Sequence, residues 1–206
     1  TRRTIEREEL TRVAGTRGDA LRTVELLPGV GRPPFGAGFL LVRGAAPGDS
    51  QVFFEGGPVP LLYHFGGLTS FINSRLLDKI DFYPGNFSVR YGRATGGVLE
   101  VTGRDPAFDG FHGVVDINVI DASFLVEAPI TDNLSIAAAA RRSYVDFFFE
   151  NVVPDDLFDV ATAPQYYDYQ LFSTWRPTDQ HRVRLIVFGS SDAFQVVFPN
   201  PGDADP

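Results

Sequence analysis

The sequence predicts two parts of different fold class: an α+β domain over residues 1–105, followed by antiparallel β-strands over residues 106–206. Helix-capping residues and short strands punctuated by glycine occur in the first part. Strict alternation of apolar and polar residues dominates the second part. No apolar run approaches the roughly 18 residues of a membrane-spanning helix, so only β-strands of the second part could cross a membrane.

Composition narrows the functional classes. The 206 residues carry a formal net charge of -8, which argues against a general affinity for nucleic acid because phosphate binding needs a basic surface. The chain has no cysteine, so disulfides, thiol catalysis and cysteine metal sites are excluded. The hydrophobic content of 44% is enough for a core, which argues against disorder of the whole chain.

The first part contains short elements of both kinds. Asp19 is placed to cap a helix that Pro28 and Gly29 end, and Thr69 or Ser70 is placed to open a second helix. In chain order, the expected elements are a helix at 20–27, strands at 39–43 and 51–55, a helix at 69–77, and strands at 79–83 and 97–102. Such short mixed elements are typical of a small α+β domain.

The second part reads as five strands. In residues 115–121, Val115, Ile117 and Val119 interleave with polar residues, which places the two sets on opposite faces of a strand. The same alternation recurs at 124–130, 167–176 and 182–188, although Ile186 and Phe188 interrupt the polar face of the last segment. These segments predict an antiparallel sheet.

The connections differ in length. Residues 131–133 and 178–180 are short polar turns, whereas residues 150–165 form a long acidic loop. Short turns at one rim and long loops at the other are typical of an outer-membrane barrel, and the aromatic run at 147–149 suits its interfacial girdle. Soluble β-sandwiches also alternate, and on this pattern alone they are the favoured interpretation.

Four stretches of the first part change that preference, because together they resemble the plug domain of TonB-dependent outer-membrane receptors. They are GDALRTVELLPGVG at 18–31, LLVRG at 40–44, VFFEGGPVP at 52–60, and LLDKIDFYPGNFSVRYGRATGGVLEVTGRDP at 76–106. The segments API at 128–130 and RRSY at 141–144 resemble the first barrel strands of the carboxypeptidase-regulatory-like branch. The ordered set is more specific than any single motif in it.

The resemblance implies a plug domain at 1–105 and the N-terminal strands of a transmembrane β-barrel at 106–206, with the barrel incomplete. It implies plug-gated, energy-coupled uptake of a substrate such as an iron chelate, a glycan or a peptide. The implied partners are a TonB-type energy transducer, outer-membrane lipid, and the remaining barrel strands or other outer-membrane proteins. The alternatives are a non-transporting outer-membrane structural or assembly subunit that reuses these parts as a scaffold, and a soluble β-rich binding protein.

The resemblance also points to residues of the plug. Arg43, Arg90, Arg93 and Asp81 are expected to contact the barrel wall. Arg43 matches a family arginine, whereas Pro84 stands where many members carry a second one. Arg104 is a further arginine suited to bidentate binding of a carboxylate. The glycines expected to provide turns or close backbone approach are Gly44, Gly85, Gly92, Gly96 and Gly97.

Tyr63, His64 and Phe65 are expected either in an apical loop that touches ligand or in the core. His64 and His112 lack the spacing of metal ligands, so no metal site or other cofactor is predicted. No Gly-x-Ser-x-Gly or phosphate-binding loop occurs. The sequence therefore predicts a protein that is not an enzyme.

Overall fold

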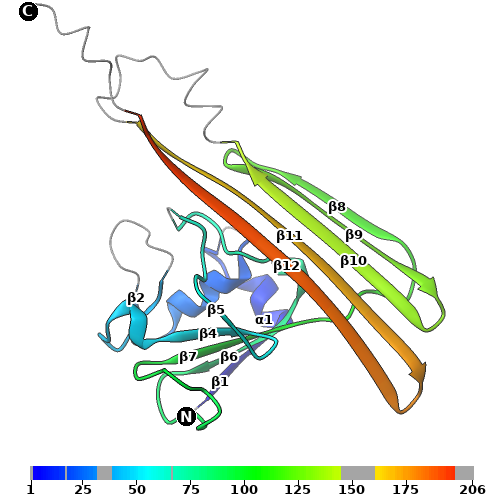
Figure 1. Cartoon of the computed structure of the whole chain (residues 1–206), viewed down its shortest axis with the longest axis horizontal. Helices are drawn as coiled ribbons and strands as arrows, with labels where there is room; N and C mark the ends of the chain where they lie inside the picture. The colour runs from blue at the N-terminus through cyan, green and yellow to red at the C-terminus, as the bar shows by residue number, and fades with distance from the viewer. Residues whose placement is uncertain (1, 17, 32–38, 66, 145–160, 198–206) are drawn as a thin grey trace, which may run out of the picture.

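The protein consists of an N-terminal body and a curved sheet of long strands that lies against it (Figure 1). The computed structural model describes residues 2–16, 18–31, 39–65, 67–144 and 161–197. We call the elements from β1 to β7 the N-terminal body and the strands β8 to β12 the long sheet. The aromatic girdle predicted at 147–149 and residues 150–160 of the loop predicted at 150–165 lie outside the described residues.

The N-terminal body is built on a mixed five-stranded sheet with the order β1-β6-β7-β4-β5. Only β4 and β7 pair in parallel; the other neighbours are antiparallel. The elements are β1 (Arg3–Glu6), α1 (Arg7–Arg12), the 3₁₀ helix η1 (Ala20–Leu26), β2 (Val30–Gly31), β3 (Leu41–Val42), the 3₁₀ turn η2 (Pro47–Asp49), β4 (Gln51–Phe54), β5 (Gly57–Val59), the 3₁₀ turn η3 (Ser74–Leu76), β6 (Leu77–Tyr83) and β7 (Val98–Gly103). This α+β architecture confirms the predicted fold class, and β4, β6 and β7 confirm three of the predicted strands.

The predicted cap of the first helix is confirmed. The carboxylate of Asp19 accepts a hydrogen bond from the backbone N–H of Leu21 at 3.1 Å, which satisfies one donor at the start of η1. The segment is a 3₁₀ helix rather than an α-helix. Its buried residues face the core, and Tyr63 Oη donates to the carbonyl of Leu21 at 3.2 Å.

The predicted helix at 69–77 is wrong, and only Ser74–Leu76 is helical. Ser70 instead forms a β-bridge with Tyr63. The backbone N–H of Ser70 donates to Asp19 Oδ2 at 2.7 Å, and that of Phe71 donates to the carbonyl of Leu62 at 3.2 Å. These long-range partners take the backbone groups that a helix would use for itself.

The long sheet is a five-stranded antiparallel meander in which strands adjacent in sequence pair with each other. Its strands are β8 (His112–Ile117), β9 (Asp121–Thr131), β10 (Leu134–Ser143), β11 (Ala161–Thr178) and β12 (His181–Val197). The short turns predicted at 131–133 and 178–180 fall between β9 and β10 and between β11 and β12. Several boundaries differ from the prediction: β8 ends at Ile117, β9 already begins at Asp121, and β12 extends to Val197. The start of β11 at Ala161 lies within the loop predicted at 150–165, so residues 161–165 belong to a strand.

The early end of β8 has a local cause. Asn118 Oδ1 accepts hydrogen bonds from the backbone N–H of Ile120 at 2.8 Å and of Asp121 at 3.1 Å. This side-chain turn reverses the chain, so Asp121 becomes the first residue of the next strand rather than the last of β8.

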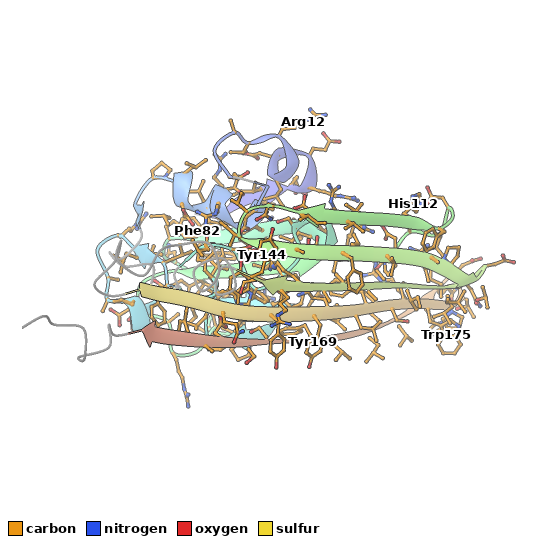
Figure 2. All side chains as sticks on the ribbon, turned by 90° about the horizontal axis from the view of Figure 1, so that it is seen from above. Arg12, Phe82, His112, Tyr144, Tyr169 and Trp175 are labelled. Atoms are coloured by element: carbon orange, nitrogen blue, oxygen red, sulfur yellow. The ribbon has the colours of Figure 1, made fainter. Side chains whose placement is uncertain are left out.

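The two faces of the long sheet have opposite character. The outer face carries exposed apolar and aromatic side chains, and Tyr169 and Trp175 are 48% and 46% exposed (Figure 2). Further members of this face are Val115, Ile117, Phe124, Val126, Ile130, Tyr167, Leu171, Val183, Leu185 and Val187. The inner face carries Glu127, Ser135, Asp168, Gln170 and Thr174, all of which are buried.

The main hydrophobic core is shared between the N-terminal body and the long sheet. Leu125, Ala137, Ala139 and Phe172 of the inner face belong to the same buried cluster as the apolar residues of the body. Phe188 packs edge-on against Phe54 with ring centroids 5.1 Å apart, and Ile186 also packs on the cluster. The two apolar residues that interrupt the polar face of β12 therefore contact the body. No helix in the described part of the chain is long and apolar enough to cross a membrane.

Gly103, the last residue of β7, marks the closest approach of the body to the long sheet. A Cβ atom there would lie 2.5 Å from Cε2 of Phe172. We predict that Gly103→Ala lowers the free energy of unfolding of the full-length protein by about 1–3 kcal/mol, because the tight contact must open. Urea unfolding in detergent measures this. Gly48→Ala is the control, since nothing lies within 4 Å of its added Cβ; equal stability of the two variants would contradict the prediction.

Candidate functional site

The candidate site is the polar contact between the N-terminal body and the inner face of the long sheet. Charged side chains meet there in three groups: the pair Arg104–Glu127, a cluster around Asp105, and a cluster around His64. Since charges are rarely buried unless they are paired, each group constrains how the body sits against the sheet.

Arg104 follows directly after β7 and binds Glu127 of β9 in bidentate fashion. Its Nη1 and Nη2 lie 2.7 and 2.6 Å from the two oxygens of Glu127. The backbone N–H of Ala107 also donates to this carboxylate at 2.9 Å, and Arg104 Nε donates to the carbonyl of Arg75 at 2.7 Å. The predicted ability of Arg104 to bind a carboxylate is confirmed by this geometry.

Asp105 is the centre of the second group, which we call the Asp105 cluster: Asp105, Thr174, Arg176, Arg182, Arg184 and Glu55. Arg184 Nε lies 3.2 Å from Asp105 Oδ1, and its Nη1 lies 3.0 Å from Glu55 Oε2 at the end of β4. Thr174, Arg176 and Arg182 add contacts of 3.0, 3.1 and 3.3 Å to the Asp105 carboxylate. Burial raises the pKa of Asp105, but the hydrogen bonds and positive charges around it outweigh that effect, and the net result is a lowered pKa.

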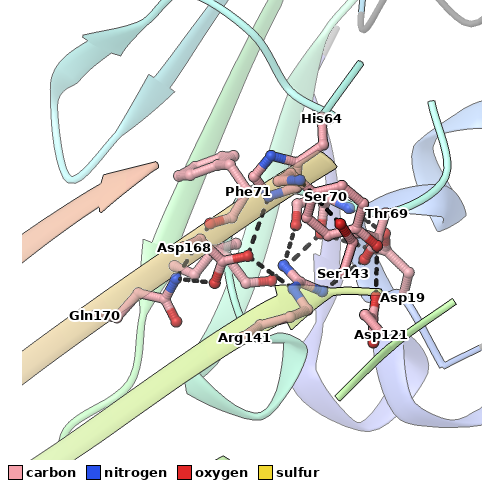
Figure 3. Close-up of polar contacts among 12 residues, drawn as sticks. Asp19, His64, Thr69, Ser70, Phe71, Asp121, Arg141, Ser143, Asp168 and Gln170 are labelled. Atoms are coloured by element: carbon pink, nitrogen blue, oxygen red, sulfur yellow. Dashed lines mark hydrogen bonds and ion pairs between the residues drawn. The ribbon is translucent and has the colours of Figure 1, made fainter. Parts of the chain in front are cut away.

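The third group, which we call the His64 cluster, lies farther along β11 and β12 and comprises His64, Arg141, Tyr166, Asp168 and Asp192. Figure 3 shows His64, Arg141 and Asp168 of this cluster. Arg141 Nε lies 2.7 Å from Asp168 Oδ2. The same guanidinium donates to Thr69 Oγ1 at 2.5 Å and to the carbonyl of Ser70, so it joins the long sheet to the body. Gln170 Nε2 donates both to Asp168 Oδ1 at 2.7 Å and to the carbonyl of Phe71 at 3.2 Å.

Strand alternation explains why these side chains meet the body. In β11 the even-numbered residues Asp168, Gln170 and Thr174 are at most 2% exposed, whereas the odd-numbered residues Tyr167 and Tyr169 are about half exposed. A strand directs successive side chains to opposite faces, so these three polar residues of β11 face the body together. Within the described ranges, no cluster of three or more His, Asp and Glu side chains has the geometry of a metal site.

The four predicted wall contacts lie in the N-terminal body. Arg90 Nη2 pairs with Glu100 Oε2 at 2.7 Å, and Asp81 contacts Thr4 and Arg2 at 2.5 and 3.5 Å. Arg43 and Arg93 adopt positive φ values of 54° and 61°. Among the described residues, no hydrogen bond or ion pair joins these four to the long sheet, so their contacts with further barrel strands stay a prediction.

The predicted glycines lie where the body turns or packs tightly. Gly97 approaches Val42, since an added Cβ would lie 2.8 Å from Cγ1 of that residue. Gly96 is similarly close to Ser50, Gly44 adopts a positive φ of 76°, and Gly85 lies beside the guanidinium of Arg43. Gly92 has no atom within 4 Å of an added Cβ. A role of these glycines in contact with further strands is untested.

Tyr63 and His64 are each 1% exposed, whereas Phe65 is 39% exposed. Tyr63 and His64 therefore lie in the core, which is the second of the two places expected for them. Contact of Phe65 with a ligand stays a prediction. Local sequence patterns did not predict the roles of Arg141, Arg184, Glu127, Asp168 and Asp192. Strand alternation placed several of them on the polar face, but no short-range pattern pairs residues that are 23 to 129 positions apart.

Comparisons with known proteins agree with the two-part architecture. Residues 1–98 match the family model of the TonB-dependent Receptor Plug Domain. The ferric enterobactin receptor PfeA from Pseudomonas aeruginosa is similar, at 18% identity and a TM-score of 0.63, over 94% of this chain and 33% of that one. The ferric yersiniabactin uptake receptor FyuA from Yersinia pestis is similar at 16% identity and a TM-score of 0.60, over 92% of this chain and 31% of that one.

The ferric citrate transporter FecA in its unliganded form matches at 20% identity and a TM-score of 0.59, over 92% of this chain and 31% of that one. The chain thus spans about a third of the length of these solved receptors. These solved receptors contain the same fold as the N-terminal body and the long sheet of this chain. No curated protein matches the sequence.

Arg141 offers a test of the His64 cluster. We predict that Arg141→Ala lowers the free energy of unfolding of the full-length protein by about 3 kcal/mol, because Asp168, 2% exposed, loses its guanidinium partner. Urea unfolding, with protease susceptibility of the body as a second readout, measures the effect. Arg142→Ala is the matched control, since Arg142 is the next residue of β10 and is exposed. A loss as small as that of the control would contradict the role of Arg141.

The lowered pKa of Asp105 predicts a pH dependence. A carboxyl whose folded pKa is below its unfolded value stabilises the folded state above the unfolded value, and that contribution disappears as the pH falls through the folded value. We expect Asp105→Asn to cost about 1–2 kcal/mol at pH 7, with the difference from wild type shrinking as the pH falls below the ordinary value of 3.8. Unfolding measured against pH tests this, with Asp132→Asn in the exposed turn as control. A difference that does not depend on pH would contradict it.

Proposed function

Because residues 1–98 form a TonB-dependent receptor plug domain, we propose that the chain is part of an outer-membrane receptor that imports a substrate with energy from a TonB-type transducer. In this proposal the N-terminal body is the plug and the long sheet is the first section of the barrel wall. The protein binds and transports, and it performs no catalysis.

The observation that carries the proposal is the opposite character of the two faces of the long sheet. Its outer face is an apolar and aromatic surface, on which Val115 and Ile117 are 73% and 74% exposed. Such a large apolar surface is unfavourable in water but suits the hydrocarbon core of a bilayer. Its inner face combines buried polar and charged residues with apolar residues of the shared core, and it holds a folded body partly through ion pairs, as a wall around a plug would do.

The edges of the long sheet support further strands as partners. β8 and β12 are the two edge strands of the sheet, and their outward backbone groups would lie unpaired in lipid at a cost of several kcal/mol per group. A barrel with room for a plug needs about 22 strands, and five cannot close around one. We propose that strands of the same polypeptide, or other outer-membrane proteins, pair with both edges.

An iron chelate is the substrate class that we place first, with glycans and peptides as the alternatives. The solved receptors that match the chain are named for ferric enterobactin, ferric citrate and ferric yersiniabactin. Their identities of 16% to 20% support the fold rather than the substrate. Growth on defined substrates is therefore the measurement that distinguishes these classes.

We predict that the full-length protein fractionates with the outer membrane and that its deletion abolishes uptake of one substrate. Deleting the TonB-type transducer should give the same loss, because transport needs the energised pull on the plug. Uptake of labelled iron chelates, glycans and peptides by the deletion strain, with a complemented strain as control, measures this. Outer-membrane location without any uptake defect would favour the scaffold subunit, and recovery from the soluble periplasm without detergent would refute both membrane functions.

A further inference from the structure

His64 presents both of its ring nitrogens to carboxylates of the long sheet. Its Nδ1 lies 2.8 Å from Asp192 Oδ1, and its Nε2 lies 3.0 Å from Asp168 Oδ2. An ionised carboxylate only accepts hydrogen bonds, so both ring nitrogens must donate to make these two contacts. Only the protonated imidazolium ring carries two N–H groups.

The charges of the His64 cluster lead to the same protonation state. Arg141 and a protonated His64 supply two positive charges, which balance the negative charges of Asp168 and Asp192. A neutral His64 would leave one carboxylate charge in excess and would direct a ring lone pair at a carboxylate oxygen. Because the side chains of His64 and Asp168 are only 1% exposed and that of Asp192 is 14% exposed, little water is available to compensate for that loss.

The other ionisable groups nearby have partners of their own. Tyr166 stacks on His64 with centroids 4.4 Å apart and an interplanar angle of 12°, and its hydroxyl donates to Asp121 at 2.6 Å. Asp121 also accepts from Asn118 at 2.8 Å. On the side of the body, Asp19 accepts from Ser70, and Arg22 donates to the carbonyls of Gly67 and Leu68. None of these groups supplies a replacement donor to Asp168 or Asp192.

We propose that His64 is a proton-dependent latch between the N-terminal body and the long sheet. The protonated ring holds the surrounding segment of the body against the long sheet. Two backbone hydrogen bonds close this segment on itself: the N–H of His64 donates to the carbonyl of Thr69 at 3.0 Å, and the N–H of Phe71 donates to the carbonyl of Leu62 at 3.2 Å. The backbone N–H of Phe65 also binds Asp192 at 3.2 Å. When His64 loses its proton, one ring contact becomes repulsive, and this segment detaches more readily from β11 and β12.

The sign of the pH effect follows from the charges. The latch is fully formed at pH values where the carboxylates are ionised and His64 is protonated, and it weakens as rising pH removes the histidine proton. One proton is involved, so the opening equilibrium changes by at most about tenfold per pH unit. This behaviour concerns attachment of the body only and does not depend on which substrate is carried, or on whether transport occurs.

Hydrogen–deuterium exchange of the full-length protein in lipid nanodiscs tests the latch. The amide of Phe65, whose N–H donates to Asp192 across the contact, is followed from pH 6 to pH 9, after correction for the intrinsic pH dependence of exchange. We expect its opening equilibrium in wild type to rise with pH, by at most about tenfold per pH unit. In His64→Gln the corrected exchange should be fast and independent of pH.

The control is His112→Gln, which removes a half-exposed histidine whose Nε2 contacts Asp109 at 2.9 Å on the surface. This variant should keep the pH dependence of wild type. An unchanged slope in His64→Gln, or loss of the slope in His112→Gln, would overturn the proposal.

The ¹⁵N spectrum of the histidine rings in the wild-type protein measures the protonation state of His64 directly. We expect both ring nitrogens of His64 to carry protons at pH 6, with the signal assigned by its disappearance in His64→Gln. A ring with a single N–H at pH 6 in wild type would refute the latch, even if the variants fail to fold.

Discussion

The pairing of buried charges across two bodies is the constraint on which this structure depends. Glu127 of the long sheet is satisfied by Arg104 next to the body, and Glu55 of the body is satisfied by Arg184 of the long sheet. Removing Arg104 would leave the carboxylate of Glu127 in a poorly hydrated place, whereas the side chain of Glu55 is 26% exposed and keeps more contact with water. These contacts fix the position of the body, although their net contribution to stability can be small. Apolar contacts such as Phe188 on Phe54 add attraction but little directional preference.

The same constraint gives the long sheet its unusual distribution of side chains. In a soluble antiparallel sheet, the apolar face packs on the core and the polar face meets water. Here Asp168, Gln170 and Thr174 face the body, whereas Tyr167, Tyr169 and Trp175 of the same strand face outward. Apolar residues occur on the inner face at positions such as Phe172 and Leu125, where they join the core of the body. The inner face is therefore matched to one partner, whereas the outer face is predominantly apolar.

Local sequence patterns predicted most of the fold but little of the site. The period of two in β9, β11 and β12 and the cap at Asp19 are short-range features, and the structure confirms them. The predicted helix at 69–77 failed because the backbone of Ser70 binds Asp19, 51 residues away. The role of His64 could not be seen for the same reason, since Asp168 and Asp192 follow it by 104 and 128 residues. The residues suggested by family resemblance lie in the body, and their wall contacts would involve strands outside this chain segment.

The two ionic clusters differ in place and in chemistry, and this difference has a mechanical meaning. The Asp105 cluster surrounds the point where the chain passes from the body to the long sheet, and it contains only arginines, carboxylates and a threonine. Along β12, Arg184 and Asp192 are eight residues apart, or about 26 Å at the usual rise of a strand. A body held at two such points cannot slide along the sheet. If the distant His64 cluster opens first, the body can only rotate about the junction, to which it remains covalently and ionically bound. The His64 cluster therefore lies at the end of the interface that is farther from the junction. Loss of this contact would allow a larger movement of the N-terminal body than loss of a contact next to the junction.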